Sequence, residues 1–306
     1  MVNITIEVDD DVFEKFNAES AMTGLSIEDS LASYIHSITS DIVFVRLPKS
    51  ADTRSLLMYG HKGRDLVASI LKTNWTAFEN PMPQYFFSCA RTWPGTIVDI
   101  GSNSGYYGML GVCANSLNDV IAFEPDPPVH AALQQNIDVN SLRDRITAFP
   151  TALSSTVGTA SLFVPSQEHG LVESSSSLEA SFKSSHSEVR RVEVDTLDRF
   201  LESSTFSQKG ISLIKIDVEG HEASVLAGAH ATVAKWRPIL FVEVLDRADF
   251  ASLSSFIAQH NYVDVPLRAE GALTAQGIVT YDQTAVNHVF VPPERLAEFL
   301  RFSRLA

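Results

Sequence analysis

The pattern of hydrophobic positions changes after about residue 95, where short apolar runs begin to alternate with stretches of helical periodicity. The apolar runs lie at 96–100, 119–123, 146–149, 211–216 and 239–244. The helical stretches lie at 105–116, 127–140, 221–235 and 247–260. Further along, the pattern indicates strands at 262–266 and 288–291 and a short helix from Glu294. This alternation is typical of βαβ units, so it predicts a mainly parallel sheet with helices packed on it.

Residues 1–40 have a different pattern. Apolar and polar side chains alternate over residues 2–8, which predicts a strand, and capping residues at Asp9 and Ser26 predict two helices after it. The order strand, helix, helix resembles a ribbon-helix-helix module, whose paired strands form a dimer and, in repressors, contact DNA. Because the first basic residue is Lys15, we expect this module to dimerise or to pack on the main domain rather than to bind DNA.

Residues 41–94 connect this module to the sheet. Periodicity predicts a strand over 42–47 and a helix over 66–72, and the stretch that follows is rich in aromatic residues and prolines, which indicates an ordered cover. Far along the chain, residues 166–187 contain nine serines in 22 residues and few large apolar side chains. We expect a mobile loop or insertion there.

The composition narrows the class of protein. Of the 306 residues, 45% are hydrophobic and 20% charged, as in an ordinary soluble globular protein. The formal charge of −14 disfavours a broad nucleic-acid or anionic-membrane surface. The two cysteines, Cys89 and Cys113, form no framework for disulfides or zinc. Because no signal-peptide pattern or long apolar run is visible, we expect a cytoplasmic protein with no nucleic-acid or membrane partner.

The segment TIVDIGSNSGYYG, residues 96–108, carries the first candidate site. A strand leads into a turn between Gly101 and Gly105, and ligands bind at such turns in doubly wound sheets. A dinucleotide fingerprint has glycine at the middle position, where the pyrophosphate approaches the backbone, but here that residue is Asn103. A side chain is compatible with a nucleoside that carries an amino-acid tail and no phosphate. The turn therefore indicates S-adenosylmethionine and conflicts with an NAD-dependent oxidoreductase.

A carboxylate at the end of the next strand supports this interpretation. Glu124 follows Gly101 by 23 residues, where it can accept hydrogen bonds from both ribose hydroxyls. Asp99 is expected to serve the ammonium group of the methionine part, directly or through water, and Asn103 or backbone amides its carboxylate. Pro125 is placed against the adenine. Each feature alone is also explained by a helix cap or a common turn, but their order and spacing favour the donor site.

The segment LIKIDVEGHE, residues 213–222, brings reactive side chains to the same edge of the sheet. His221 is the candidate general base, because an imidazole can accept a hydroxyl proton at cellular pH. Asp217 would orient it or the acceptor, and Lys215 shares its face of the strand. Glu243, which ends the next strand, would bind acceptor hydroxyls or pair with Lys215. The alternative is that His221 and Glu222 cap the next helix and Lys215 pairs with an acid.

The acidic residues also raise the question of a metal ion. Asp217, Glu243 and His221 together offer ligands for a divalent cation. No tight ligand spacing demands one, so a metal is not part of the predicted site.

Taken in order, these segments resemble the FkbM-type S-adenosylmethionine-dependent methyltransferases, which commonly methylate hydroxyl oxygens on sugars and natural products. The matching segments are TIVDIGSNSGYYG (96–108), IAFEPDP (121–127), LQQNIDVN (133–140), VDTLD (194–198), IKIDVEGHEASVLAGA (214–229) and RPILFVEV (237–244). KIDVEGHE is the most specific of them. The resemblance spans approximately residues 75–292, so it leaves out the first 40 residues, and the serine-rich segment departs from the family pattern.

The resemblance implies a Rossmann-like, seven-stranded class I methyltransferase domain over residues 95–306. It implies a donor site that contains Asp99, Gly101, Gly105 and Glu124. Ala152 is expected beside the adenine, and Ser102 and Tyr106, next to the glycines, are expected as further contacts.

We therefore expect O-methylation of a hydroxyl on a sugar, glycan or natural product, with S-adenosylmethionine as donor and S-adenosylhomocysteine as product. The expected partner is a small-molecule or glycan acceptor, and residues 1–40 offer a surface for a homodimer. The alternative is a regulator that senses S-adenosylmethionine or binds DNA through residues 1–40.

Overall fold

The computed structural model describes residues 26, 29, 42–60, 65–165, 176–179, 186–204, 206, 210–270 and 273–304. The strand-helix-helix module expected over residues 1–40 lies outside the described residues, apart from Ser26 and Asp29. There the amide nitrogen of Asp29 donates to Ser26 Oγ at 3.0 Å, which is the capping contact expected at that position. Most of the serine-rich segment also lies outside the described residues.

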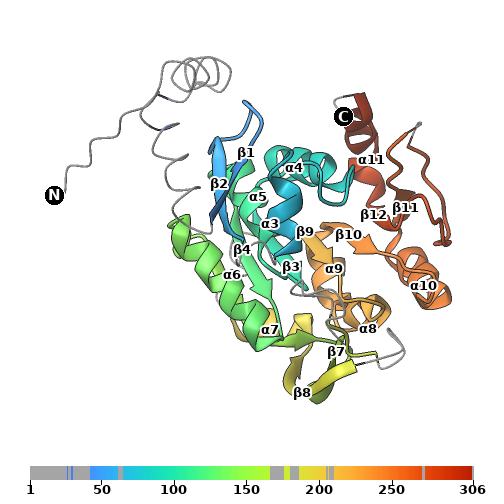
Figure 1. Cartoon of the computed structure of the whole chain (residues 1–306). Coiled ribbons are helices and arrows are strands. Elements are labelled where there is room, and N and C mark those ends of the chain that lie inside the picture. The colour runs from blue at the N-terminus through green and yellow to red at the C-terminus, as the bar shows by residue number, and fades with distance from the viewer. Residues whose placement is uncertain are drawn as a thin grey trace.

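A seven-stranded sheet forms the centre of the molecule (Figure 1). Its strands are β3 (Thr96–Ile100), β4 (Asp119–Phe123), β5 (Ile146–Phe149), β9 (Ile211–Ile216), β10 (Ile239–Glu243), β11 (Val263–Pro266) and β12 (Asn287–Val291). The strand order is β11-β12-β10-β9-β3-β4-β5. β12 pairs antiparallel with both neighbours, and the other pairs are parallel. The predicted seven-stranded, mainly parallel fold is confirmed, because every predicted apolar run forms a strand of this sheet.

Helices cover both faces of the sheet, because successive side chains of a strand point to opposite faces. Ile97 and Leu213 face one core, whereas their neighbours Val98 and Ile214 face the other. The first core includes residues of α4 (Met82–Thr92), α5 (Tyr106–Ala114), α6 (Pro127–Val139) and α11 (Pro293–Phe299). The second includes residues of α7 (Leu197–Ser203), α8 (Glu222–Ala227), α9 (His230–Trp236) and α10 (Phe250–His260). None of the helices in the described part of the chain has the length and apolar character needed to cross a membrane.

The described part of segment 41–94 packs into the first core. It consists of a hairpin and two helices, namely β1 (Ile42–Arg46), β2 (Ser55–Tyr59), α3 (Leu66–Leu71) and α4. The first strand and α3 were predicted, whereas β2 was not, and α4 forms inside the aromatic cover. Asn136 of α6 and Asn140, its C-cap residue, attach the hairpin. Asn140 Oδ1 accepts from the amide of Leu57 and Asn136 Oδ1 from that of Tyr59, both at 2.8 Å.

A second sheet of three strands, in the order β6-β8-β7, was not predicted. It comprises β6 (Ala152–Leu153), β7 (Gly158–Pro165) and β8 (His186–Asp195). Part of the expected mobile loop belongs to this sheet, because residues 186 and 187 lie in β8 and the amide of Phe163 donates to the carbonyl oxygen of Ser177 at 2.8 Å. The sequence pattern predicted neither of these backbone pairings.

The helix expected over 221–235 is divided into α8 and α9. Asp198 in α7 explains the break. Its amide donates to the carbonyl oxygen of Gly228 at 3.0 Å, and its carboxylate accepts from the amides of Ala231 at 2.8 Å and Thr232 at 2.7 Å in the first turn of α9. A side chain from another helix thus caps the start of α9.

Candidate functional site

The turn between β3 and α5 has a shape that depends on its glycines. Gly101 and Gly105, the latter at the N-cap of α5, have φ angles of 71° and 88°, in the left-handed region that strains other residues. A Cβ at Gly101 would lie 1.8 Å from the carbonyl oxygen of Asp217, and one at Gly105 would lie 2.4 Å from Leu133 Cδ1. Asn103, between them, has a φ of 51°. The turn therefore packs tightly against the end of β9.

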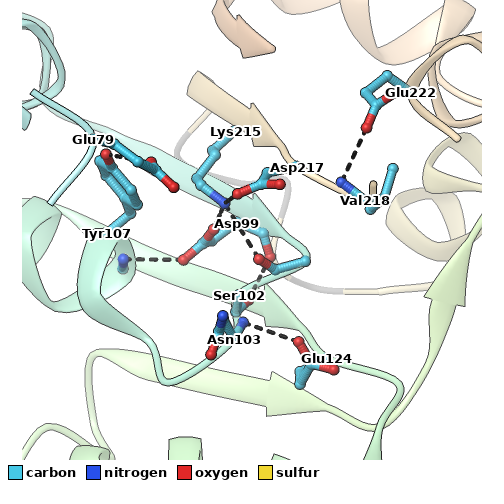
Figure 2. A network of polar contacts seen from close by, with 12 residues as sticks. Glu79, Asp99, Ser102, Asn103, Tyr107, Glu124, Lys215, Asp217, Val218 and Glu222 are labelled. Atoms are coloured by element: carbon cyan, nitrogen blue, oxygen red, sulfur yellow. Dashed lines mark hydrogen bonds and ion pairs between the residues drawn. The ribbon is translucent and has the colours of Figure 1, made fainter. Parts of the chain in front are cut away.

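Glu124 holds this turn from the end of β4 (Figure 2). Its Oε2 accepts from the amide of Asn103 at 2.9 Å, and its Oε1 accepts from the amide of Asp126 at 3.0 Å. Burial raises the pKa of Glu124 to about 7, although both hydrogen bonds act to lower it. A carboxylate oxygen has two lone pairs, so each oxygen retains the capacity to accept one more hydrogen bond.

A cavity lies beside Glu124, with about 600 Å³ of empty space that is partly open to solvent. Residues singled out in the sequence that line the cavity are Gly101, Asn103, Glu124, Pro125, Ala152, Asp217 and His221. Apolar side chains and the second sheet complete the wall, including Phe123, Leu153, Leu162 and Leu178. The structure thus brings together residues from four separate predicted segments.

Four other expected donor-site residues do not line the cavity, namely Asp99, Ser102, Gly105 and Tyr106. The Ser102 hydroxyl donates to the carbonyl oxygen of Asp99 at 2.7 Å. The Asp99 carboxylate is fully buried, and its Oδ2 accepts from the amide of Gly108 at 3.0 Å. Tyr106 is buried, and its hydroxyl donates to the carbonyl oxygen of Trp75. These side chains support the turn and α5 from behind.

Lys215 is buried among acidic groups next to the turn (Figure 2). Its Nζ lies 3.1 Å from Asp217 Oδ2 and 3.9 Å from Asp99 Oδ1, and it donates to the carbonyl oxygen of Gly101 at 3.2 Å. Burial acts to lower the pKa of Lys215, but the charges of Asp217, Asp99 and Glu79 outweigh this effect and raise the pKa above its usual value. The side chain is therefore a fixed positive charge, and the acid partner that the sequence left as an alternative is Asp217.

Glu79 joins this cluster from the loop before α4, a role that sequence reasoning missed. Its Oε2 accepts from the hydroxyl of Tyr107 at 2.8 Å, and the Tyr107 ring centroid lies 5.3 Å from Lys215 Nζ. Burial, followed by repulsion from Asp217, raises the pKa of Glu79 to about 7. The signal available in the sequence was that Glu79 is the one acidic residue in the aromatic and proline-rich stretch 74–95.

Glu243 and two neighbouring acidic residues form a cluster of carboxylates at the ends of β9 and β10. One carboxylate oxygen each from Asp217, Glu219 and Glu243 lies within 4.8 Å of the others. Oε2 of Glu243 is closed to solvent and has no hydrogen-bond partner among the described residues. Burial, followed by repulsion from Asp217 and Glu219, raises the pKa of Glu243 well above its usual value. His221, which the sequence offered as a third metal ligand, is not part of this group.

His221 is the N-cap residue of α8, but its side chain makes no capping hydrogen bond. Its Nε2 lies 2.9 Å from Ser154 Oγ, and its Nδ1 lies 2.7 Å from Glu179 Oε1. Ser154 follows β6, and Glu179 belongs to the serine-rich segment. Neither residue belongs to a recognisable motif, so the sequence offered no signal for this contact.

Glu222 closes the turn that carries these groups (Figure 2). Its Oε1 accepts from the amides of Val218 at 3.2 Å and Gly220 at 3.0 Å. Burial raises the pKa of Glu222 to about 7. Glu222 therefore supports the loop between β9 and α8 from inside and does not face the cavity.

The strand order and the cavity at the carboxyl ends of β3, β4 and β9 define a class I methyltransferase fold. The sequence profile described as the methyltransferase FkbM domain matches residues 99–264, more than half of the chain. The chain belongs to the FkbM methyltransferase family. No match was found among curated proteins.

Solved structures provide further similarities. A methyltransferase FkbM from Methylobacillus flagellatus KT is 16% identical with a TM-score of 0.42, over 64% of this chain and 43% of that chain. An O-methyltransferase from Bacillus cereus in complex with S-adenosylhomocysteine is 10% identical with a TM-score of 0.40, over 70% and 81%. A precorrin-6y C5,15-methyltransferase from Geobacter metallireducens GS-15 is 10% identical with a TM-score of 0.39, over 70% and 88%. The chain thus covers less than half of the FkbM protein and most of the other two.

Proposed function

We propose that the chain binds S-adenosylmethionine in the cavity beside Glu124 and transfers its methyl group to a hydroxyl oxygen of a sugar, glycan or natural product. The observation that carries this proposal is the buried Glu124 carboxylate, which faces the cavity and retains the capacity to accept two more hydrogen bonds. Membership of the FkbM family supports the type of reaction.

The residues that line the cavity fit this donor. Glu124 would accept hydrogen bonds from the ribose hydroxyls, and the apolar side chains around Ala152 and Pro125 suit a flat adenine ring. The backbone at Asn103 reaches the cavity wall, where a carboxylate tail can bind. Among the described residues that line the cavity, none is lysine or arginine, which suits a ligand without phosphate.

Isothermal titration calorimetry with S-adenosylhomocysteine and NAD tests the proposal directly. We expect the wild-type chain to bind S-adenosylhomocysteine in the micromolar range, about −8 kcal/mol. NAD should bind at least about 100-fold more weakly, because Asn103 occupies the position at which its pyrophosphate needs a glycine. Equal or tighter binding of NAD would refute the proposal.

Methyl transfer requires an acceptor hydroxyl in line with the donor and a group that takes its proton. The bound donor supplies an electrophilic methyl group. We place the proton at His221 Nε2, while Glu179 accepts a hydrogen bond from Nδ1–H and so leaves Nε2 as the basic atom. Ser154 occupies Nε2 in this structure, so an acceptor hydroxyl would take its place.

The carboxylates at the other end of the site bind and orient the acceptor in this proposal. Asp217 lines the cavity and is held by Lys215, which itself does not reach the cavity and acts as a positioning residue. Glu243 would accept hydrogen bonds from acceptor hydroxyls. Donor and acceptor would then meet near Asp217, between Glu124 and Glu243.

His221→Ala is expected to slow methyl transfer by about 100-fold or more, since general bases contribute factors of this size. The measurement is transfer of radiolabelled methyl groups from S-adenosylmethionine to a panel of methyl glycosides and polyols. S-adenosylhomocysteine should bind to the variant within a few-fold of wild type. Ser154→Ala is the matched control, because it removes the other partner of Nε2 and should leave the rate intact. Equal rates for His221→Ala and wild type would show that the proton leaves elsewhere.

A further inference from the structure

Three acidic side chains converge where two neighbouring strands end. Asp217 directly follows β9, Glu219 lies in the loop two residues later, and Glu243 is the last residue of β10. One carboxylate oxygen of each lies within 4.8 Å of the others. Three ionised carboxylates at this separation repel one another, so the arrangement needs protons or a positive charge to offset it.

Lys215 does not provide that charge for the whole group. Its Nζ lies 3.1 Å from Asp217 Oδ2 and also serves Asp99 and the carbonyl oxygen of Gly101. Glu243 forms no ion pair in the described part of the chain, and its Oε2 is closed to solvent without a hydrogen-bond donor. A buried carboxylate oxygen without a donor or cation costs free energy. This unpartnered oxygen is the feature that a bound cation would explain.

The cluster of three carboxylates borders the cavity. Asp217 and Glu219 are among the cavity-lining residues, and the loop that carries Glu219 is held from both sides. Glu222 Oε1 accepts from the amide of Gly220 at 3.0 Å, and the Ser177 hydroxyl donates to the carbonyl oxygen of Glu219 at 2.9 Å. The three carboxylates are therefore supported in place, next to the space proposed for the methyl donor.

We propose that Asp217, Glu219 and Glu243 bind one divalent cation that prefers oxygen ligands, such as Mg²⁺ or Mn²⁺. Carboxylate oxygens are the ligands that these hard cations take in proteins, and an octahedral ion held by three of them keeps three positions for water or substrate. The ligand set differs from the one considered in the sequence, because Glu219 takes the place of His221.

This inference rests on the proposed function in one respect: the acceptor oxygen would occupy one of the open positions on the cation. A hydroxyl bound to a divalent cation loses its proton more readily, which assists transfer of that proton to His221. An acceptor with two adjacent hydroxyls, as in a sugar ring, can fill two open positions at once. The site thereby favours polyhydroxylated acceptors.

Titration of Mn²⁺ into the chelator-treated full chain, followed by the electron paramagnetic resonance signal of free Mn²⁺, tests this inference. We expect one Mn²⁺ per chain for wild type, displaced by Mg²⁺. Glu243→Gln should bind Mn²⁺ at least about tenfold more weakly, because it removes one of three charged ligands. Glu298→Gln is the matched control, since it removes the same charge from an exposed position on α11 and should bind like wild type.

The outcomes separate this inference from the proposed function, because S-adenosylhomocysteine binding is measured on the same samples without metal. The cation site is overturned if wild type binds no Mn²⁺, or if Glu243→Gln binds Mn²⁺ as strongly as wild type. Either result counts against the site even when S-adenosylhomocysteine binds. Bound Mn²⁺ with no S-adenosylhomocysteine binding supports the cation site and overturns the donor site. Circular dichroism checks the fold of each variant. If Glu243→Gln fails to fold, Glu219→Gln decides by the same tenfold criterion.

Discussion

Glu124→Gln is expected to weaken S-adenosylhomocysteine binding by about 100-fold, the largest effect on binding that the structure indicates. Glu124 accepts hydrogen bonds from the amides of Asn103 and Asp126, and its remaining lone pairs face the cavity. Hydrogen bonds to a charged acceptor contribute about 1.5–3 kcal/mol, and a glutamine keeps only one acceptor oxygen. Isothermal titration calorimetry of both proteins measures the difference.

The same variant should remove a pH dependence. Burial raises the pKa of Glu124 to about 7 in the free chain, and ribose hydroxyls donate to the ionised form. Binding therefore releases a proton at low pH, so the wild-type affinity should fall by up to about tenfold per unit as the pH drops below about 7, and level off above it. In Glu124→Gln this slope should disappear.

Glu298→Gln serves again as the control, because that exposed glutamate lies on α11 and does not line the cavity. Its binding constant and pH profile should match wild type. A Glu124→Gln protein that binds S-adenosylhomocysteine as tightly as wild type would place the ribose elsewhere and refute the role of this carboxylate.

Lys215→Met is expected to lower the free energy of unfolding by about 3–5 kcal/mol, as is typical when one partner of a buried ion pair is removed. Methionine fills similar space, but it leaves the fully buried Asp99 without its cation and removes the ammonium that Asp217 contacts at 3.1 Å. Denaturant unfolding followed by tryptophan fluorescence measures the loss. Lys49→Met, at an exposed position, should unfold like wild type.

The loss should depend on pH in a defined direction. The folded-state pKa of Lys215 is raised, so its own contribution is fully present at every pH below the usual lysine value and does not vary near neutrality. Burial raises the pKa of Asp99, and Lys215 acts against this, so the variant raises that pKa further. A carboxyl group with a higher pKa in the folded state than in the unfolded state lowers the free energy of unfolding. This loss develops as the pH rises from the unfolded-state pKa to the folded-state pKa. The deficit of Lys215→Met should therefore grow as the pH rises above the usual aspartate pKa and be smallest at acidic pH.

A second substitution tests this explanation. Lys215→Met combined with Asp99→Asn should recover part of the lost stability, because the buried uncompensated charge is gone. An additive or larger loss in the double variant, or a deficit that grows toward low pH, would contradict the assigned charge pairing.

Much of the fold could be predicted from the sequence, because periodicity is a local property. The runs at 96–100 and 211–216 are short, apolar and flanked by turn signals, which a buried parallel strand requires. The prediction of one continuous helix over 221–235 was wrong, because the break involves Asp198 from another helix. The sheet formed by β6, β7 and β8 was missed because it is held by pairings between distant segments.

The turn at Gly101 and the carboxylate at Glu124 could be located from the sequence, because their spacing along one βαβ unit puts them at the same sheet edge. The other groups of the site come from distant segments and were found in the folded chain. Glu79 and Glu179 arrive from the cover and from the serine-rich segment, and Oε2 of Glu243 is closed to solvent in the folded chain. Burial and long-range contact set the charge and the partners of these groups, and both arise only when the chain folds.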